Sequence, residues 1–303
     1  MVMENSGAAC KAKGKQMIAI TGAGGKTGRA LIQALARRNL AVRAVVRSAG
    51  FSESLRALGA TDVAEAEFAA TNQLAVAFAG AAAVYHICPN MHPAEVEIAR
   101  YVVEAARRAG VSRIVYHSVL HPQVEAMPHH WQKMRVEEML FTAGVDFTIL
   151  QPAAYMQNLQ AYFPAVCGEG IYRVPYAAHT RLGMVDLDDV AAAAAAVLSE
   201  PGHAGAIYEL ANGEAYSQAE VAALLSELLG RTVRCEAIAR PAWSVSARAG
   251  GLPAYAVETL LRMFEYYEAH GFWGNATILG ALLARKPVTL RAWLQRSLAD
   301  ACL

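Results

Sequence analysis

Short apolar runs alternate with longer amphipathic segments along the first 150 residues of the chain. The short runs predict six strands, at 17–20, 41–46, 62–68, 83–88, 113–117 and 147–150. The segments between them have apolar positions at a helical period and predict helices at 27–38, 53–58, 72–78, 93–109 and 128–143. Such alternation with short turns is typical of a parallel sheet with right-handed crossovers. We therefore predict an α/β fold, a doubly wound parallel sheet of the Rossmann type.

The second half of the chain has a less regular pattern. Residues 151–185 look rich in loops, and the pattern then predicts a strand at 207–210 and helices at 186–198, 217–229, 254–269 and 290–301. We predict a Rossmann domain formed by 16–151 with parts of 184–210. Residues 152–183 and 211–303 would form a smaller, mixed substrate lobe over the carboxyl edge of the sheet, where such sheets bind ligands. Residues 1–15 are basic without an apolar core and predict a flexible tail, not a signal peptide.

Composition narrows the class of protein. Of 303 residues, 55% are hydrophobic and 17% are charged, as in a compact globular protein. The net charge of +1 gives no reason to expect nucleic acid or a membrane surface as a partner. The longest apolar run, Val190–Leu198, is too short to cross a bilayer. The five scattered cysteines predict reduced thiols in a cytoplasmic protein, which we expect to be a monomer or homodimer.

A glycine cluster follows the first predicted strand. Gly22, Gly25 and Gly28 have the spacing G-x-x-G-x-x-G, and a helical pattern starts directly after them. Unpaired backbone N–H groups and the helix dipole favour an anion at such a turn, so a pyrophosphate could bind there. Lys26-Thr27 precedes the last glycine, which excludes a Walker loop. The turn predicts dinucleotide binding.

Arg47 stands at the end of the second predicted strand, where NAD-binding sheets usually carry an acidic residue. A guanidinium there suits the 2′-phosphate of NADP, which a carboxylate would repel. Lys26 could supply a second positive charge. We therefore predict NADP(H) in preference to NAD(H); the alternative is that Arg47 is an ordinary surface arginine.

The catalytic chemistry is less clear from the residues. The chain contains no Tyr-x-x-x-Lys, and Lys133 is the one lysine between the glycine turn and the last helices. It falls on the helix after the fifth strand, where a cation could hold the nicotinamide ribose. His129, one helical turn earlier, could donate a proton. Alternatively, the segment 129–133 is a solvated first turn, and water protonates a quinone-like or dye-like product.

Other candidates follow from their positions after the strands. Ser118, after the fifth strand, could bind substrate or nicotinamide, whereas Tyr116 packs in the sheet. Tyr155, shortly before Asn158, could line the nicotinamide pocket or serve packing alone. The candidate catalytic residues are Lys133, His129, Ser118 and Tyr155.

Two further clusters admit a structural explanation. Asp186, Asp188 and Asp189 lack the spacing of a calcium loop, and capping of a helix explains them better than a metal does. Several aromatic residues near the C-terminus could wall an apolar substrate pocket or belong to the core. They are Phe264, Tyr266, Tyr267, Phe272 and Trp273.

Taken together, these residues resemble the NmrA-like family of atypical short-chain dehydrogenase/reductases. The likeness is carried by segments 20–29, 115–118, 152–158, 185–191 and 286–291, with Arg47, Lys133, Val136, Glu137 and Leu140. It implies NADP(H) bound at the first turn, at Arg47 and at the ends of strands three to six. The cofactor-binding residues would be Thr21, Gly22, Gly24, Gly25, Lys26, Thr27, Gly28, Arg47, Phe68, Ile87, Cys88, Pro89, Ser118, Lys133, Pro152 and Tyr155.

The chain departs from the family pattern at two positions. Glu67 stands where many relatives have aspartate, and Gln151 precedes Pro152 where arginine is frequent. The family includes reductases of quinones, dyes and phenylpropanoids, and sensors that bind the dinucleotide without turnover. We expect an NADPH-dependent oxidoreductase with a small aromatic or conjugated acceptor. One alternative is a non-catalytic NADP sensor. The other is a nucleotide-sugar epimerase or dehydratase, which the absence of Tyr-x-x-x-Lys disfavours.

Overall fold

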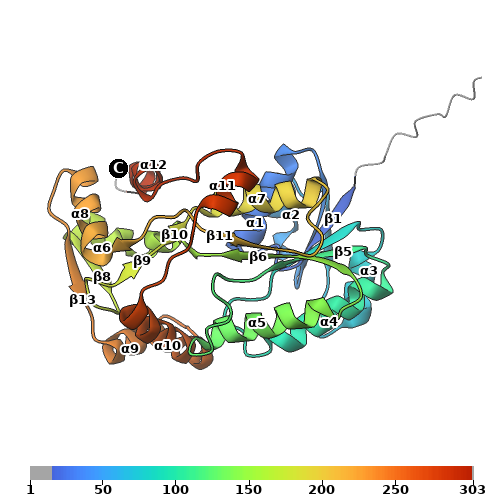
Figure 1. The fold of residues 1–303 in the computed structure, drawn as a ribbon, viewed down its shortest axis with the longest axis horizontal. Helices are drawn as coiled ribbons and strands as arrows, with labels where there is room; N and C mark the ends of the chain where they lie inside the picture. The colour runs from blue at the N-terminus through green and yellow to red at the C-terminus, as the bar shows by residue number, and fades with distance from the viewer. Residues whose placement is uncertain (1–15, 302–303) are drawn as a thin grey trace, which may run out of the picture.

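The computed structural model describes residues 16–301, and its centre is one parallel sheet of seven strands (Figure 1). The strands lie in the order β11-β6-β5-β4-β1-β2-β3, and every neighbouring pair is parallel. Their bounds are β1 Met17–Ile20, β2 Ala41–Val46, β3 Asp62–Glu65, β4 Ala83–His86, β5 Arg113–His117, β6 Asp146–Pro152 and β11 Ala206–Leu210. The six predicted strands are confirmed, and the late strand joins them as the seventh. The strand order reverses between β1 and β4, and sheets of this kind bind ligands at the carboxyl ends of the strands at such a reversal.

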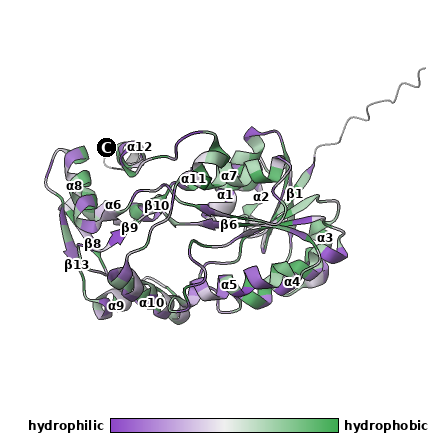
Figure 2. Ribbon diagram, in the orientation of Figure 1, coloured by the Kyte–Doolittle hydropathy of each residue, from purple (hydrophilic) through white to green (hydrophobic). Residues whose placement is uncertain are grey.

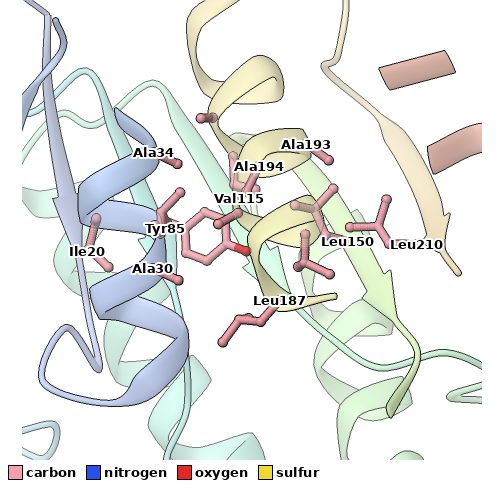
Figure 3. Packing of buried hydrophobic residues seen from close by; sticks show 14 of the residues in the cluster. Ile20, Ala30, Ala34, Tyr85, Val115, Leu150, Leu187, Ala193, Ala194 and Leu210 are labelled. Carbon is pink, nitrogen blue, oxygen red and sulfur yellow. The ribbon is translucent and has the colours of Figure 1, made fainter. Parts of the chain in front are cut away.

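Helices cover both faces of the sheet (Figure 1). One face carries α1 (Lys26–Arg37), α2 (Ser52–Ala57) and α7 (Leu187–Ser199), and the other carries α3 (Thr71–Phe78), α4 (Glu95–Arg108) and α5 (Pro128–Phe141). Alternate residues along the buried strands enter the two cores: Tyr85 and Val115 face α1 and α7, whereas Val84 and Ile114 face α3 and α4. Alanines on α1 and α7 let both helices approach the sheet closely (Figure 3). Figure 2 shows α7 as predominantly hydrophobic, as its burial requires.

Most of the remaining elements lie beyond the end of the sheet where β6 terminates, whereas η1 (Ala49–Phe51) precedes α2 and α11 (Thr277–Leu283) lies beside α7 (Figure 1). The others are β7 Ala154–Tyr155, η2 Met156–Tyr162, α6 Phe163–Glu169, β8 Ile171–Val174, β9 Arg181–Leu182, β10 Met184–Val185, β12 Tyr216–Ser217, α8 Gln218–Leu229, β13 Arg234–Ala237, α9 Arg240–Ala249, α10 Ala254–His270 and α12 Leu290–Ala301. A third core cluster links η2, α6, β8, α8 and α12. Residues 151–185 are therefore not mainly loop, contrary to the prediction. The prediction failed because α6 and β8 are too short to show a period in the sequence. The proposed division into two lobes stays a prediction.

Asp186, the first of the three aspartates at the start of α7, caps that helix, as predicted. Asp186 is the N-cap residue and accepts a hydrogen bond from the Asp188 amide. Asp189 binds the Arg285 guanidinium at 2.5 Å and the Val288 amide at 2.6 Å, which ties the segment before α12 to α7. The prediction of reduced thiols is wrong at Cys167, which is disulfide-bonded. Within 16–301, no helix is long and apolar enough to cross a membrane.

Candidate functional site

The glycine turn leaves no room for side chains. A Cβ on Gly28 would lie 2.6 Å from the Ala23 Cα and 2.7 Å from the Gly22 carbonyl oxygen. Gly22 has φ +64°, and its Cβ would stand 2.8 Å from the Ile87 carbonyl oxygen. Gly25, the N-cap of α1, has no side chain to bind the first N–H groups of that helix. This arrangement fits the pyrophosphate of a dinucleotide, which needs close approach to the backbone and free donors.

Two cations lie beside this turn. Arg47 is exposed directly after β2, and its guanidinium makes no hydrogen bond or ion pair with any residue in 16–301. Lys26 donates to Asn158 Oδ1 at 2.8 Å, and its Nζ lies 5.9 Å from the Tyr155 ring centroid. Partial burial lowers the pKa of Lys26. Lys26 therefore links α1 to the segment after β6, whereas the guanidinium of Arg47 is available for a ligand.

The structure places Lys133 inside the protein, with 6% of its surface exposed. Its ammonium donates to Glu95 Oε1 at 2.9 Å, to the His117 carbonyl at 3.1 Å and to the Tyr116 hydroxyl at 3.5 Å. These three partners match the three donors of an ammonium group. Contact between Lys133 and a nicotinamide ribose would require one of these bonds to break.

His129 is buried on α5, one turn before Lys133. Segment 129–133 is thus not a solvated first turn, and that alternative is wrong for His129, His130 and Lys133. Burial, and then the charge of Lys133, hold the pKa of His129 well below its ordinary value. The imidazole is neutral at physiological pH, which weighs against His129 as the proton donor.

The hydroxyl of Ser118 is hydrogen-bonded to a buried carboxylate. Its hydroxyl donates to Glu137 Oε1, and Gln151 Nε2 donates to both oxygens of the same group at 3.0 and 2.9 Å. Burial raises the pKa of Glu137, although the hydrogen bonds and Lys133 oppose the shift. Gln151, a departure from the family pattern, thus contacts Glu137 through a neutral amide. Because the proton of Ser118 is directed to Glu137, Ser118 can offer a ligand only the lone pairs of its oxygen.

A second polar chain lies on the other face of the sheet, and the sequence did not predict it. His117 Nδ1 lies 2.7 Å from the Tyr85 hydroxyl, and His117 Nε2 lies 2.5 Å from the Tyr155 hydroxyl. Thr27 Oγ1, in the first turn of α1, donates to Tyr155 at 3.5 Å. Figure 3 shows the Tyr85 ring between α1 and α7. Polar residues at the last two positions of the buried β4 and β5 are the signal that could have indicated this chain.

The remaining predicted cofactor-binding residues lie at or after the carboxyl ends of strands in the sheet. Thr21 is hydrogen-bonded to His86 Nδ1 at 2.9 Å, and Phe68 meets the His86 ring edge-on at 6.0 Å. Burial is the main cause that raises the pKa of the Cys88 thiol, so Cys88 is protonated. Pro89 and Pro152 follow β4 and end β6, respectively.

The C-terminal aromatic residues occupy mixed environments. Tyr267 and Phe272 are buried with rings 5.0 Å apart, and Phe264 packs on Trp243 at 4.8 Å. Trp273 is 47% exposed, and Tyr266 is partly buried. Phe272 also meets the edges of His121 and His130 at 5.5 Å each, so it connects the lobe to the start of α5. Packing accounts for Tyr267 and Phe272.

Comparison with known proteins agrees with this geometry. The model of the NmrA-like family matches residues 14–294. The chain belongs to the NmrA-like family. Among curated proteins, it is 29% identical to quinone oxidoreductase 2 of Escherichia coli (strain K12) over 276 residues, which cover 90% of this chain and 96% of that protein. It is 31% identical to the NAD(P)H azoreductase of Xenophilus azovorans, over 73% of this chain and 77% of the relative.

The likeness of this NmrA-like protein to its relatives extends to a solved structure. The NADPH complex of the Escherichia coli NADPH-dependent quinone oxidoreductase superposes with a TM-score of 0.82 at 28% identity and covers 94% of this chain and 99% of that one. The predicted family and Rossmann fold are confirmed.

Proposed function

We propose that this NmrA-like protein is an NAD(P)H-dependent reductase that transfers hydride to a small aromatic or conjugated acceptor, such as a quinone or an azo dye. The close glycine cradle at Gly22 and Gly28 is the observation that carries the proposal, because it suits a dinucleotide pyrophosphate. The names of two curated relatives, a quinone oxidoreductase and an azoreductase, support the reaction class. When bound, the reduced dinucleotide supplies the hydride, and the protein binds and orients both reactants.

Apolar side chains in the core around the sheet support the proposed acceptor class. Partly buried apolar side chains from both halves of the chain pack, like Tyr155, against the largest core cluster, among them Ile87, Val124 and Tyr176. Flat conjugated molecules suit such a surface. Relatives named for quinone and azo acceptors support the same class.

An acceptor screen tests the function. Purified protein with NADPH is monitored at 340 nm with quinones, azo dyes and carbonyl compounds, and acceptor-dependent oxidation is expected. Gly28→Ala should abolish NADPH binding, because its Cβ would collide with the backbone at Ala23, whereas Gly168→Ala, in open space, should bind normally. Tight NADPH binding without oxidation by any acceptor would instead support a sensor.

Arg47 is the basis of the proposed preference for NADP(H). Its unpaired guanidinium at the end of β2 suits a 2′-phosphate. In Arg47→Ala, the KM for NADPH should rise about 10- to 100-fold, since a hydrogen-bonded charge pair contributes about 1.5–3 kcal/mol, and the KM for NADH should change little. Arg37→Ala, at the far end of α1, is the control. Equal losses for NADH and NADPH would contradict the assignment.

We further propose that the partners are small molecules and not nucleic acids or membranes, that the protein acts in the cytoplasm, and that it is a monomer or homodimer. The near-neutral net charge of +1 supports the first statement. Free thiols at Cys88 and Cys235 support the second, whereas the disulfide-bonded Cys167 opposes it. Cell fractionation and light scattering test location and mass.

A further inference from the structure

The hydrogen-bond directions in the chain Tyr85–His117–Tyr155 can be worked out from burial. Tyr85 is 1% exposed, and within residues 16–301 its hydroxyl has His117 Nδ1 as its hydrogen-bond partner. A buried O–H without an acceptor costs more than a spare lone pair, so Tyr85 donates to Nδ1. The neutral imidazole then carries its proton on Nε2 and donates it to the Tyr155 oxygen.

The Tyr155 oxygen therefore accepts from two protein groups. His117 Nε2–H is one donor, and the Thr27 hydroxyl is the other. With both lone pairs of the phenol oxygen engaged, its own proton is not used by either partner. Tyr155 is half-buried at the carboxyl end of the sheet, beside Lys26 and the glycine turn, so this proton is left for a ligand bound there.

We propose that Tyr155 is the proton donor to the reduced acceptor and that His117 is a positioning residue for it. The inference rests on the proposed reductase function. The acceptor gains a hydride, and with it two electrons, from NADPH, which is oxidised. The Tyr155 O–H bond breaks, and its proton forms an O–H or N–H bond on the acceptor. The resulting phenolate is stabilised by the donors on His117 and Thr27, and solvent returns one proton after product release.

The protonation states agree with these roles. Burial raises the pKa of Tyr155 to about 12, so the phenol holds its proton at neutral pH. Burial, with Lys133 and His86, lowers the pKa of His117 to about 3, so the imidazole stays neutral and keeps one donor. The positive charge of Lys26 near the Tyr155 ring favours the phenolate when it forms. Within pH 6–9, neither Tyr155 nor His117 titrates, and kcat should be flat.

Two acceptors separate proton donation from a structural role. A quinone needs a proton after hydride transfer, whereas a cationic triarylmethane dye becomes neutral on accepting hydride and needs none. At saturating NADPH, Tyr155→Phe should lower kcat about 100-fold or more with the quinone and far less with the dye. Tyr85→Phe, which leaves His117 Nδ1 without its donor, should lower quinone kcat several-fold. His117→Leu should lower it further, and His117→Gln, which keeps a donor, should partly restore it.

Controls keep each outcome decisive. Tyr208→Phe removes a comparable tyrosine–histidine hydrogen bond, 2.9 Å to His203, outside the candidate site and should match wild type with both acceptors. Unchanged quinone kcat in Tyr155→Phe, equal losses with quinone and dye, or a loss confined to NADPH affinity would overturn the role of Tyr155. If the dye is not an acceptor, NADPH affinity by fluorescence titration replaces it as the control. Wild-type protein inactive with every acceptor would instead refute the reductase function.

Discussion

Lys133 is connected to the site through other residues, whereas its predicted contact with a ligand stays a prediction. Its ammonium donates to the carbonyl of His117, the residue whose imidazole reaches Tyr155. Glu95, 1% exposed, compensates the charge of Lys133 at 2.9 Å. A buried charge without its partner lowers the stability of the fold. Lys133 can therefore stabilise the end of β5 only while Glu95 is also present.

Removal of Lys133 is therefore a test of stability as well as of activity. Lys133→Ala should lower the free energy of unfolding by about 3 kcal/mol or more, because Glu95 is left as a buried charge without its cation. Urea denaturation measures the loss, and the double variant Lys133→Met, Glu95→Leu should recover part of it. Arg135→Ala, from an exposed pair on the same helix, is the control. A loss no larger than that of Arg135→Ala would show that the buried pair contributes little.

At the level of elements, helix α7 organises the C-terminal part of the chain. Asp186 binds Gln157 at 2.7 Å and Arg296 at 2.8 Å, and thereby connects the segment after Tyr155 with α12. Asp189 holds the segment before α12 through Arg285 and the Val288 amide. One helix start thus fixes both the site-bearing segment after β6 and the end of the lobe.

Asp189→Ala should destabilise the protein by about 2 kcal/mol or more, because it leaves the partly buried Val288 amide and the Arg285 guanidinium without their acceptor. Asp189→Asn, which keeps an acceptor for the amide, should lose less. Thermal unfolding followed by circular dichroism ranks the stabilities of these variants. Asp188→Asn, at an exposed position, is the control and should not change the melting temperature. Equal melting temperatures for Asp189→Ala and Asp188→Asn would refute the anchoring role.

The elements also show what a sequence can and cannot predict. The strands and helices of the sheet were predicted because a buried strand or an amphipathic helix leaves a period within its own residues. The Asp186 cap was predicted for the same local reason. The hydroxyl of Tyr85 meets an imidazole 32 residues away, and Lys133 meets a carboxylate 38 residues away, so tertiary packing alone brings these partners together.

For the whole molecule, buried neutral histidines determine the response to acid. Burial lowers the pKa of His86 and of His117 to about 3 and that of His130 to about 4. The unfolded chain binds these protons near pH 6.5, so below that pH it binds more protons than the folded protein does. Stability is complete above about pH 6.5 and falls as the pH drops toward 4.

His130 offers a single-site test of this dependence. It is 0% exposed, and its ring meets Phe272 across the junction with the lobe. A pKa of about 4 should cost the folded state about 2 kcal/mol at pH 5 relative to pH 8. Urea denaturation of His130→Leu at both pH values should show a drop smaller than the wild-type drop by that amount. The exposed His270→Ala is the control; an identical drop in His130→Leu and wild type would contradict the assignment.

The position of β11 has a consequence for how this chain can be divided. Strand β11 pairs with β6 along five residues, Ala206 to Leu210, although more than fifty residues separate the two strands in sequence. A fragment that stops after β6 would therefore present that strand as a bare edge, with a row of unpaired amides and carbonyls open to a second molecule. We expect such a fragment to aggregate in concentrated solution, and we expect proteolysis or truncation between residues 152 and 206 to leave no independently folded half.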